Sequence, residues 1–524
     1  MQRTQLALQG TQAAIGLQAE AVDGIQRLIS CCQALVQLAA QDQQGLIDLS
    51  RLILILQRAQ CPLLLLQALA LLPQLQLQCS QPRQLATHLL QSLLGLPHLR
   101  LQGSQLLCPC LGLGQLLLAA LTQHLQRLLL SDKLLASTLA ALDIMKAGGN
   151  AIDAAIAANA VLGVVEPMSC GIGGDLFAIV WDAKSRKLYG LNASGRSPFG
   201  ISRQLIRDRG HERIPLKGPL SWSVPGCVSG WQALHDRFGK LPLAKSLAPA
   251  IRYARDGFPV TQIIAGYWKS GEVILSETPT ASRAFLKDGR APGEGERMTN
   301  RDLAKVYRAI GKEGAKAFYG GWIAGEIVRY SESVGGLITL RDLKQHTADW
   351  VEPVSASYRG YDVWELPPNG QGIAALQILN VLEQHDIAAM GHNSADFIHI
   401  YTEAKKLAFA DRAKFYADPQ VEKNLPVAEL ISKPYAKRQA KRIDMAKAAL
   451  RVPAGDPRLA KGDTIYLTAV DKDRNVVSLI QSNYYGFGSG HVPGNVGFVM
   501  QNRGTLFAMD ENHHNRLEPN KRPF

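Results

Sequence analysis

Apolar and polar positions alternate most clearly near the end of the chain, where they predict two neighbouring β-strands. Apolar and β-branched residues fill positions 465–470, and positions 476–480 repeat the pattern after a short polar run. This pattern is typical of a hairpin whose turn lies in the polar run. Thr464 opens the first strand, directly after Asp463 and a loosely patterned segment at 453–463. The hairpin is therefore expected to present a hydroxyl group at its front edge.

The rest of the chain from residue 131 onward mixes helical and strand periodicity. Asn150 can cap a helix, with Asp153 at the N3 position of that helix. Together these patterns indicate a mixed α and β fold. Helices are predicted over 134–146, 151–165, 243–256, 302–313, 315–331, 340–345, 373–384 and 394–417, and strands over 176–181, 187–191, 353–358 and 361–366. The last two strands are expected to form a hairpin with Arg359-Gly360 at its turn, and Thr339 can cap the helix at 340–345.

A Gly-rich run, Gly171-Ile-Gly-Gly-Asp175, precedes the first predicted strand. It lacks both the Gly-Lys-Ser/Thr of a phosphate loop and the G-x-G-x-x-G spacing of a dinucleotide site. The absence of side chains suits a different role, the close approach of the backbone to a site or to a neighbouring strand. We therefore expect this run to lie directly against other backbone.

Composition changes sharply near residue 130 of the 524-residue chain. Residues 1–130 contain 40 Leu and 25 Gln, no Lys, no aromatic residue and six of the eight Cys. Three interpretations stay open: a helical interaction segment, low-complexity sequence, or a stretch that is not a selected protein segment. The cysteines lack the spacing of a zinc site, and unpaired thiols are expected. No signal-peptide pattern is found, which favours the cytoplasm over secretion.

Charge and hydropathy exclude several function classes. The formal charge is +13, from 57 Lys and Arg against 44 Asp and Glu, and the basic residues are scattered apart from 437–442. That short run fits a solvated helix face, and no basic motif interleaved with aromatics predicts nucleic-acid binding. No apolar run is long enough to span a membrane. His392 and His399 stand alone, so no metal is expected.

The chemistry of Thr464 suggests a catalytic hypothesis. A threonine hydroxyl is a poor nucleophile unless a base lies beside it. An N-terminal α-amine has a pKa of about 7.7–8.0, close to what a general base needs. Cleavage of the Asp463–Thr464 bond would therefore place nucleophile and base on one residue. The alternative is that Thr464 is simply a β-branched residue in a strand.

Several motifs, taken together and in order, resemble the γ-glutamyltransferase family from about residue 131 to the end. The hairpin start at Asp463-Thr464 matches the beginning of the family's small subunit. The other matching stretches are Ala147-Gly-Gly-Asn-Ala-Ile-Asp-Ala-Ala, Glu166-Pro-Met-Ser-Cys-Gly-Ile-Gly-Gly-Asp, Val224-Pro-Gly, Ala254-Arg-Asp-Gly-Phe, Glu365-Leu-Pro-Pro-Asn-Gly-Gln-Gly, Ala410-Asp-Arg, Ala469-Val-Asp-Lys-Asp-Arg-Asn-Val-Val-Ser and Gly486-Phe-Gly-Ser-Gly.

The resemblance implies a fold and a reaction. The expected fold is α+β, a four-layer αββα sandwich of the N-terminal-nucleophile hydrolase type. One precursor would yield a large subunit, 131–463, and a small subunit, 464–524, and the family allows a dimer of these. Thr464 would attack a small-molecule amide, form an acyl-enzyme and pass the acyl group to water or an amine. No metal or organic cofactor is implied.

Two residues take family roles in this interpretation. Ser482 falls where the family has a threonine that hydrogen-bonds the new α-amine, and a serine hydroxyl can do the same. Arg196 is assigned to the substrate carboxylate because a guanidinium can bind it in a bidentate manner. The register is not clean, since alignment on Pro198 places Ser194 at the family's arginine.

Other positions depart from the family pattern. Tyr484 stands where many members of the family have an asparagine that binds the substrate carboxylate. The run that contains Asn502 and Arg503 stands where the family has an acidic stretch that binds the γ-glutamyl ammonium group. An anionic or uncharged acyl group is therefore expected. This pattern is closer to the acylase-like and amidohydrolase-like branch, which includes enzymes acting on oxamate or glutaryl amides, than to transferases that cleave glutathione.

The end of the chain raises the remaining alternatives. In the family the small subunit continues beyond the position of Phe524, through a Gly-Gly pair whose amides form the oxyanion hole. One alternative is therefore a truncated product that neither cleaves itself nor catalyses a reaction. The other is an interaction protein that associates through its Leu- and Gln-rich segment.

Overall fold

The structure of the protein is a computed structural model that describes residues 132–450, 452 and 463–524. The predictions for residues 1–130, and for the loosely patterned residues 453–462, lie outside the described residues.

A five-stranded antiparallel sheet forms the centre of the described residues, with the strand order β5-β2-β1-β9-β8. The predicted hairpin of β8 and β9 is present, and β8 is an edge strand of the sheet. Strand β1 pairs with β9 on one side and with β2 on the other. Strands β1 and β9 are neighbours although about 300 residues separate them in the chain. The bounds are Asp175–Asp182 for β1, Lys187–Ala193 for β2, Asp349–Val351 for β5, Asp463–Val470 for β8 and Val476–Tyr484 for β9.

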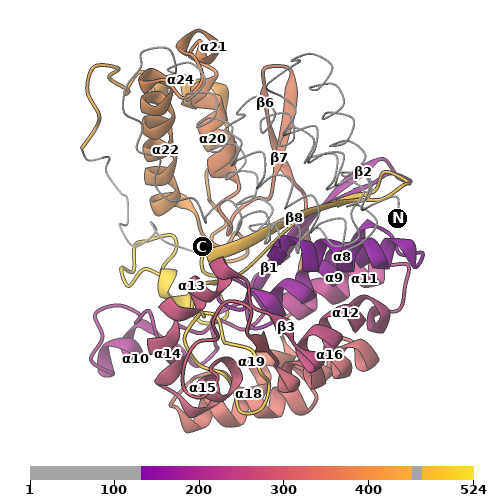
Figure 1. Cartoon of the computed structure of the whole chain (residues 1–524). Helices are drawn as coiled ribbons and strands as arrows, with labels where there is room; N and C mark the ends of the chain where they lie inside the picture. Colours follow the sequence, from indigo (N-terminus) through magenta and orange to yellow (C-terminus); the bar gives the residue numbers. More distant parts are fainter. Residues whose placement is uncertain (1–131, 451, 453–462) are drawn as a thin grey trace, which may run out of the picture. The chain divides into compact units, whose positions relative to one another are not determined.

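Helices cover one face of this sheet (Figure 1). Every residue of α9 is buried, and its small side chains let it lie close to the sheet and to its neighbours. The predicted cap is confirmed: the Asn150 side chain accepts from the N3 amide, and Asp153 accepts in return from Asn150. The layer consists of α8 Asp132–Lys146, α9 Ala151–Val165, α11 Cys227–Phe238, α12 Leu243–Asp256 and α16 Arg301–Glu313.

The opposite side of the sheet carries the second predicted hairpin and a second group of helices (Figure 1). The hairpin turns at Arg359 and Gly360, both with positive φ, as the sequence predicts. Tyr466 and Ile480 point away from the first helical layer and are 64% and 37% exposed. The elements are β6 Val354–Tyr358, β7 Tyr361–Glu365, α20 Ile373–Leu382, α22 Ala395–Phe415 and α24 Lys433–Ala440.

The remaining helices and two short strands complete the described fold. The single helix predicted at 315–331 is wrong: Gly320 and Gly321 end α17 and start α18, because glycine favours a helix boundary. Thr339 caps α19 in a capping box, as predicted. The connecting elements are α10 Arg203–Asp208, η2 Pro219–Ser221, β3 Phe258–Pro259, α13 Gln262–Ser270, α14 Glu272–Ser276, α15 Pro279–Phe285, β4 Arg297–Met298, α17 Ala315–Tyr319, α18 Trp322–Ser333, α19 Leu340–Lys344, α21 Ile387–Met390, α23 Val427–Leu430 and η4 Arg503–Leu506.

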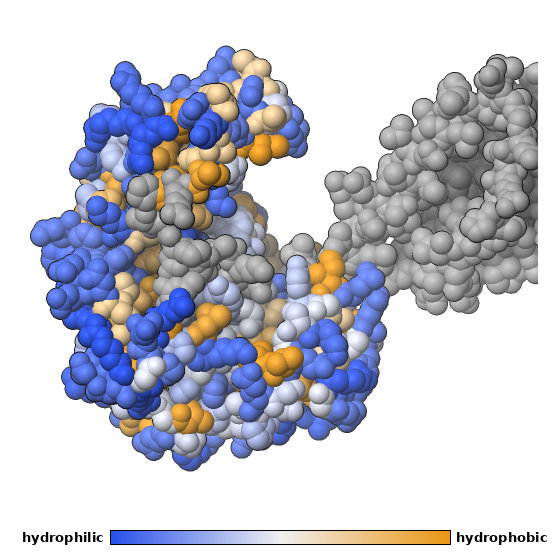
Figure 2. Space-filling model, turned by 90° about the vertical axis from the view of Figure 1, so that its left-hand side faces the viewer, coloured by the Kyte–Doolittle hydropathy of each residue, from blue (hydrophilic) through white to orange (hydrophobic). Residues whose placement is uncertain are grey.

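The surface in Figure 2 is mostly hydrophilic, with hydrophobic residues in small groups between the polar ones. The basic residues of 437–442 begin within α24, as their helical pattern predicts. Within the described part of the chain, no helix combines the length and apolar character that a membrane crossing needs.

The turn between β8 and β9 is fastened to the start of α9. Asp471 Oδ2 accepts from the amide of Ala151 at 3.1 Å and from the side chain of Asn475 at 2.9 Å. Its other oxygen accepts from the amides of Asp473 and Asn475. These bonds hold the pKa of Asp471 below its usual range, although partial burial acts in the opposite direction. A carboxylate at a helix N-terminus is also favoured by the helix dipole.

Replacing Asp471 with alanine should lower the free energy of unfolding by about 1–3 kcal/mol, because the helix start and the turn both lose their acceptor. Urea unfolding followed by tryptophan fluorescence measures the change. Asp473→Ala, at an exposed position of the same turn, is the control and should shift stability by less than about 0.5 kcal/mol. Equal effects of the two variants would contradict this account.

Candidate active site

The Gly-rich run before β1 lies directly against other backbone, as the sequence predicts. A Cβ atom on Gly173 would lie 1.8 Å from the carbonyl oxygen of Val499, and one on Gly174 would lie 2.2 Å from that of Ser482. Only glycine fits at such distances. The run therefore brings the start of β1 into contact with the end of β9 and with the segment that follows it.

Thr464 lies at the same end of the sheet, where the pairing of β8 with β9 is irregular. Asp463 pairs with Tyr484 and Ile465 pairs with Gln481, so the register shifts at Thr464. Thr464 is exposed, and its hydroxyl donates to Ser482 Oγ at 3.1 Å. Ser482 is buried, and its Oγ also accepts from the amide of Tyr484 at 2.8 Å. Such bulges commonly aim a side chain next to an active site.

Asp175 and Arg503 form an ion pair beside this hydroxyl pair. Asp175 is the direct strand neighbour of Ser482. Its Oδ2 lies 2.6 Å from Arg503 Nε, and the side chains are 1% and 17% exposed. Burial raises the pKa of Asp175, while Arg503 and the hydrogen bonds from Gln501 and Gly195 oppose that rise. Arg503 also lies over the ring of Tyr484, with 5.3 Å from its Cζ to the ring centroid.

The structure thus gathers four predicted site residues, Thr464, Ser482, Tyr484 and Arg503, at one end of the sheet. Asn502 precedes Arg503 in the chain, but it is buried and its side-chain amide forms hydrogen bonds with the main chain. Its Oδ1 accepts from the amide of Tyr485 at 3.2 Å, and its Nδ2 donates to the carbonyl of Leu216 at 2.8 Å. Asn502 therefore positions the segment that carries Arg503.

Arg196 belongs to a second charged cluster. It donates to Asp349 Oδ2 at 3.0 Å and to Gln420 Oε1 at 2.7 Å, and its side chain is 12% exposed. Arg522 reaches the same carboxylate oxygen at 2.6 Å and is 1% exposed. Burial opposes ionisation of Asp349, yet the two arginines hold its pKa below the usual range. A second carboxylate lies beside the pair: Asp418 Oδ2 accepts from the amide of Arg522 at 2.9 Å, and its charge acts on the Arg522 guanidinium.

His346 lies near this second cluster. It is buried, and its Nε2 is 3.1 Å from Ser229 Oγ. Burial lowers the pKa of His346 to about 3, and the positive charges of Arg522 and Arg196 act in the same direction. The imidazole is therefore neutral in the folded protein at any pH near neutrality.

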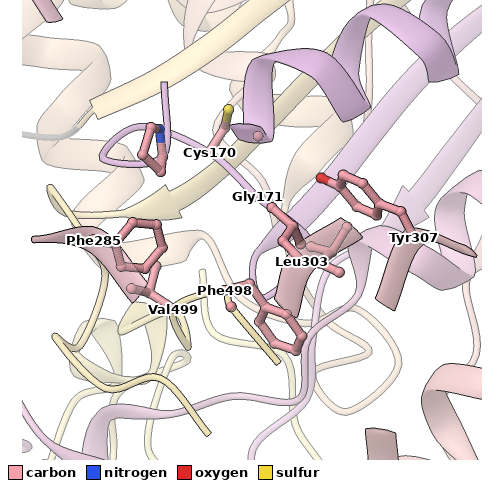
Figure 3. Close-up of a pocket in the computed structure, with 11 residues that line it drawn as sticks. Cys170, Gly171, Phe285, Leu303, Tyr307, Phe498 and Val499 are labelled. Atoms are coloured by element: carbon pink, nitrogen blue, oxygen red, sulfur yellow. The ribbon is translucent and has the colours of Figure 1, made fainter. Parts of the chain in front are cut away.

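Two cavities in the described residues contain none of the predicted site residues. The first, behind Gly171 and Cys170, has a volume of about 10 Å³, room for one water molecule at most (Figure 3). The second, of about 550 Å³, is lined by residues of and around α11 and α16. Within the described residues, no cluster of three or more His, Cys, Asp or Glu could hold a metal ion.

The described chain is similar to proteins of one enzyme family in both sequence and structure. The family's sequence model, described as Gamma-glutamyltranspeptidase, matches residues 137–524. This chain belongs to the γ-glutamyltranspeptidase family. The match begins within a few residues of the start that the sequence motifs indicate.

Individual relatives agree with this family. The glutathione hydrolase-like YwrD proenzyme of Bacillus subtilis (strain 168) is 40% identical over 382 residues, covering 73% of this chain and 71% of the relative. The oxamate amidohydrolase proenzyme of Klebsiella pneumoniae is 36% identical over 390 residues, covering 73% and 72%. A crystal structure of cephalosporin acylase from Bacillus halodurans superimposes with a TM-score of 0.68 and 42% identity, covering 74% and 71%.

These similarities confirm three predictions. The fold is the mixed helix and sheet fold of N-terminal-nucleophile hydrolases of the γ-glutamyltranspeptidase and acylase type. The protein is an enzyme of a family of hydrolases, transferases and acylases. Its relatives are proenzymes, which agrees with subunits that arise from one precursor.

Asp175 lies within one of the matching motifs, and neither this residue nor Arg522 is assigned a role by the sequence. The partners of both lie far away in the chain: Gln501 and Arg503 for Asp175, Asp349 for Arg522. The only available signal was an acid at the end of a Gly-rich run, next to a predicted strand.

Acidification from about pH 7.5 to about pH 5 should cost the fold roughly 2 kcal/mol through His346 alone. Its pKa in the fold, about 3, lies below the ordinary value of 6.5. The contribution is therefore complete above pH 6.5 or so, and it is lost as the pH falls toward 3 because the unfolded chain takes up a proton first.

His346→Gln tests this, since an amide can still bond Ser229 without titrating. Urea unfolding at both pH values should show a loss that is roughly 2 kcal/mol smaller in this variant. His392→Gln, at an exposed position, is the control and should follow the unmodified protein. An unchanged pH dependence in His346→Gln would refute the assignment.

Proposed function

We propose that this chain is a precursor that cleaves itself between Asp463 and Thr464 and then hydrolyses amides through an acyl-enzyme on Thr464. The proposed large subunit is 131–463 and the small subunit 464–524, with a dimer of these as the proposed assembly. The observation that carries the proposal is the exposed Thr464 hydroxyl, placed 3.1 Å from the buried hydroxyl of Ser482 at a register shift of the sheet.

In the proposed reaction the freed α-amine of Thr464 takes the proton of its own hydroxyl. The oxygen forms a bond to the carbonyl carbon of the amide, and the nitrogen leaves with the proton as an amine. The resulting ester is then attacked by water or by a second amine, which regenerates the hydroxyl. Ser482 supports this scheme because its oxygen is within reach of the terminal residue and is fixed by the amide of Tyr484.

The acyl group is proposed to be anionic or uncharged. Arg503 stands at the site, and the run Gln501-Asn502-Arg503-Gly504 holds no acid that could pair with a substrate ammonium group. The name of one relative points the same way: the Klebsiella pneumoniae relative is named for oxamate, whose acyl group carries a carboxylate. The Bacillus halodurans acylase is named for a cephalosporin.

Arg196 is proposed to meet a substrate carboxylate, with Tyr484 and Arg503 on the acyl side. Support comes from its partial exposure, since the side chain of Arg196 is 12% exposed and that of its neighbour Arg522 is 1% exposed. A guanidinium that reaches the surface can bind a carboxylate in a bidentate manner.

The purified full-length chain should separate into two polypeptides on a denaturing gel, the smaller with Thr464 at its N-terminus and 61 residues to Phe524. Thr464→Ala should remain one polypeptide and show no amidase activity, because the nucleophile and its amine are both lost. Thr468→Ala, at an exposed position of the same strand, is the control and should cleave normally. Amidase activity in a chain whose Asp463–Thr464 bond stays intact would refute the mechanism.

Ser482→Ala should lower kcat/KM of the cleaved enzyme by about 10- to 100-fold, the value of one hydrogen bond to a charged group. Ser482→Thr should restore most of the activity, because it keeps the hydroxyl. Ser478→Ala, which removes another hydroxyl of β9 that bonds Tyr466, is the control. If alanine and threonine at 482 behave alike, the hydroxyl has no part in the reaction.

A further inference from the structure

Arg503 does not stand at the site as an isolated cation. Its Nε lies 2.6 Å from Asp175 Oδ2, and the carboxylate is 1% exposed. A buried ion pair of this kind is electrically close to neutral when seen from the site. The side chain of Arg503 is 17% exposed, so part of it still reaches the surface.

The carboxylate of Asp175 is held by hydrogen bonds on one of its oxygens and by an ion pair on the other. Oδ1 accepts from the amide of Gly195 at 2.7 Å and from Gln501 Nε2 at 2.8 Å, while Oδ2 meets Arg503 as an ion pair. The backbone of Asp175 is paired with Ser482, whose hydroxyl accepts from Thr464. Asp175 therefore links the nucleophile's strand pair to the segment that carries Arg503.

We propose that Asp175 is a positioning and specificity-determining residue, which holds Arg503 at the end of the sheet that carries Thr464 and cancels most of its charge, so that the site accepts anionic and uncharged acyl groups of the same shape. The proposal rests on the proposed function, in that the acyl group binds beside Thr464. It adds that the selectivity of the site for charged or uncharged acyl groups depends on the net charge of Asp175 and Arg503 together, and not on Arg503 alone.

The balance gives opposite consequences for the two partners. Without the charge of Asp175, Arg503 becomes an uncompensated cation and favours an anionic acyl group. Without Arg503, Asp175 leaves the site neutral or negative and disfavours an anionic acyl group. An unscreened charge a few ångströms away changes binding by about tenfold or more at the effective dielectric of a protein surface.

The test uses two ligands that differ only in charge: the monoamide of glutaric acid, which is an anion, and glutaramide, which is neutral. Their affinities are measured by titration calorimetry on the full-length Thr464→Ala chain, so binding is read without cleavage or turnover. The quantity compared is the ratio of the two affinities. The ratio in this background, which keeps Arg196, is the reference value for the variants.

Asp175→Asn should raise the ratio in favour of the anion by about tenfold or more, and Arg503→Gln should lower it by a similar factor. The double variant should return to the starting ratio, a result that general damage to the fold would not produce. Asp182→Asn, at the other end of β1, is the control and should leave the ratio unchanged. Thermal melting identifies any variant that does not fold. If Asp175→Asn does not fold, the affinity ratios of Arg503→Gln and of the double variant still test the proposal.

A ratio that stays within twofold in the folded single variants overturns the proposal, as does the absence of binding by either ligand. Failure of the proposed function is seen separately, as an intact Asp463–Thr464 bond and no release of ammonia from either amide by the unmodified chain. An active enzyme with unchanged charge selectivity would reject the role of Asp175 alone.

Discussion

Direct contact between backbone segments, with no side chain between them, determines the architecture of the site. Gly173 and Gly174 lie against the carbonyls of Val499 and Ser482. Gly195 and Gly226 repeat the arrangement: a Cβ on them would lie 1.7 Å from the carbonyl oxygen of Val224 and 1.9 Å from that of Ala193. Segments distant in the chain can therefore lie backbone against backbone, which larger residues would prevent.

Hydrogen bonds make this contact specific. The carbonyl of Gly174 accepts from the amides of Gly226 and Cys227 at the start of α11, and the carbonyl of Gly173 accepts from the amide of Gln501. Because these are main-chain bonds on the same few residues, a shift of one segment would disturb the others. Rigid support of this kind is what a nucleophile needs if its partners come from separate parts of the chain.

Local features were predictable, whereas pairings across the chain were not. The cap at Asn150, the turn at Arg359 and the hairpin that begins at Asp463 depend on neighbouring residues, and the structure agrees with them. The prediction of a single helix at 315–331 was wrong because it followed the helical periodicity of the segment and disregarded the Gly320-Gly321 pair, at which the structure divides it into two helices. The partners of Asp175 and Asp349 could not be predicted, since a carboxylate's sequence neighbours do not identify an arginine hundreds of residues away.

Ser194 shows how a residue that is distant in the chain can bring a guanidinium to a position where the local sequence has none. The hydroxyl of Ser194 donates to Asn192 Oδ1. Its carbonyl, however, accepts from Arg522 Nε at 2.9 Å, so a guanidinium does reach this place, from the end of the described chain. Arg522 shares Asp349 with Arg196, and its amide donates to Asp418. Two arginines and two acids from separate parts of the chain therefore meet here, and of the two arginines Arg196 is the more exposed, at 12% against 1%.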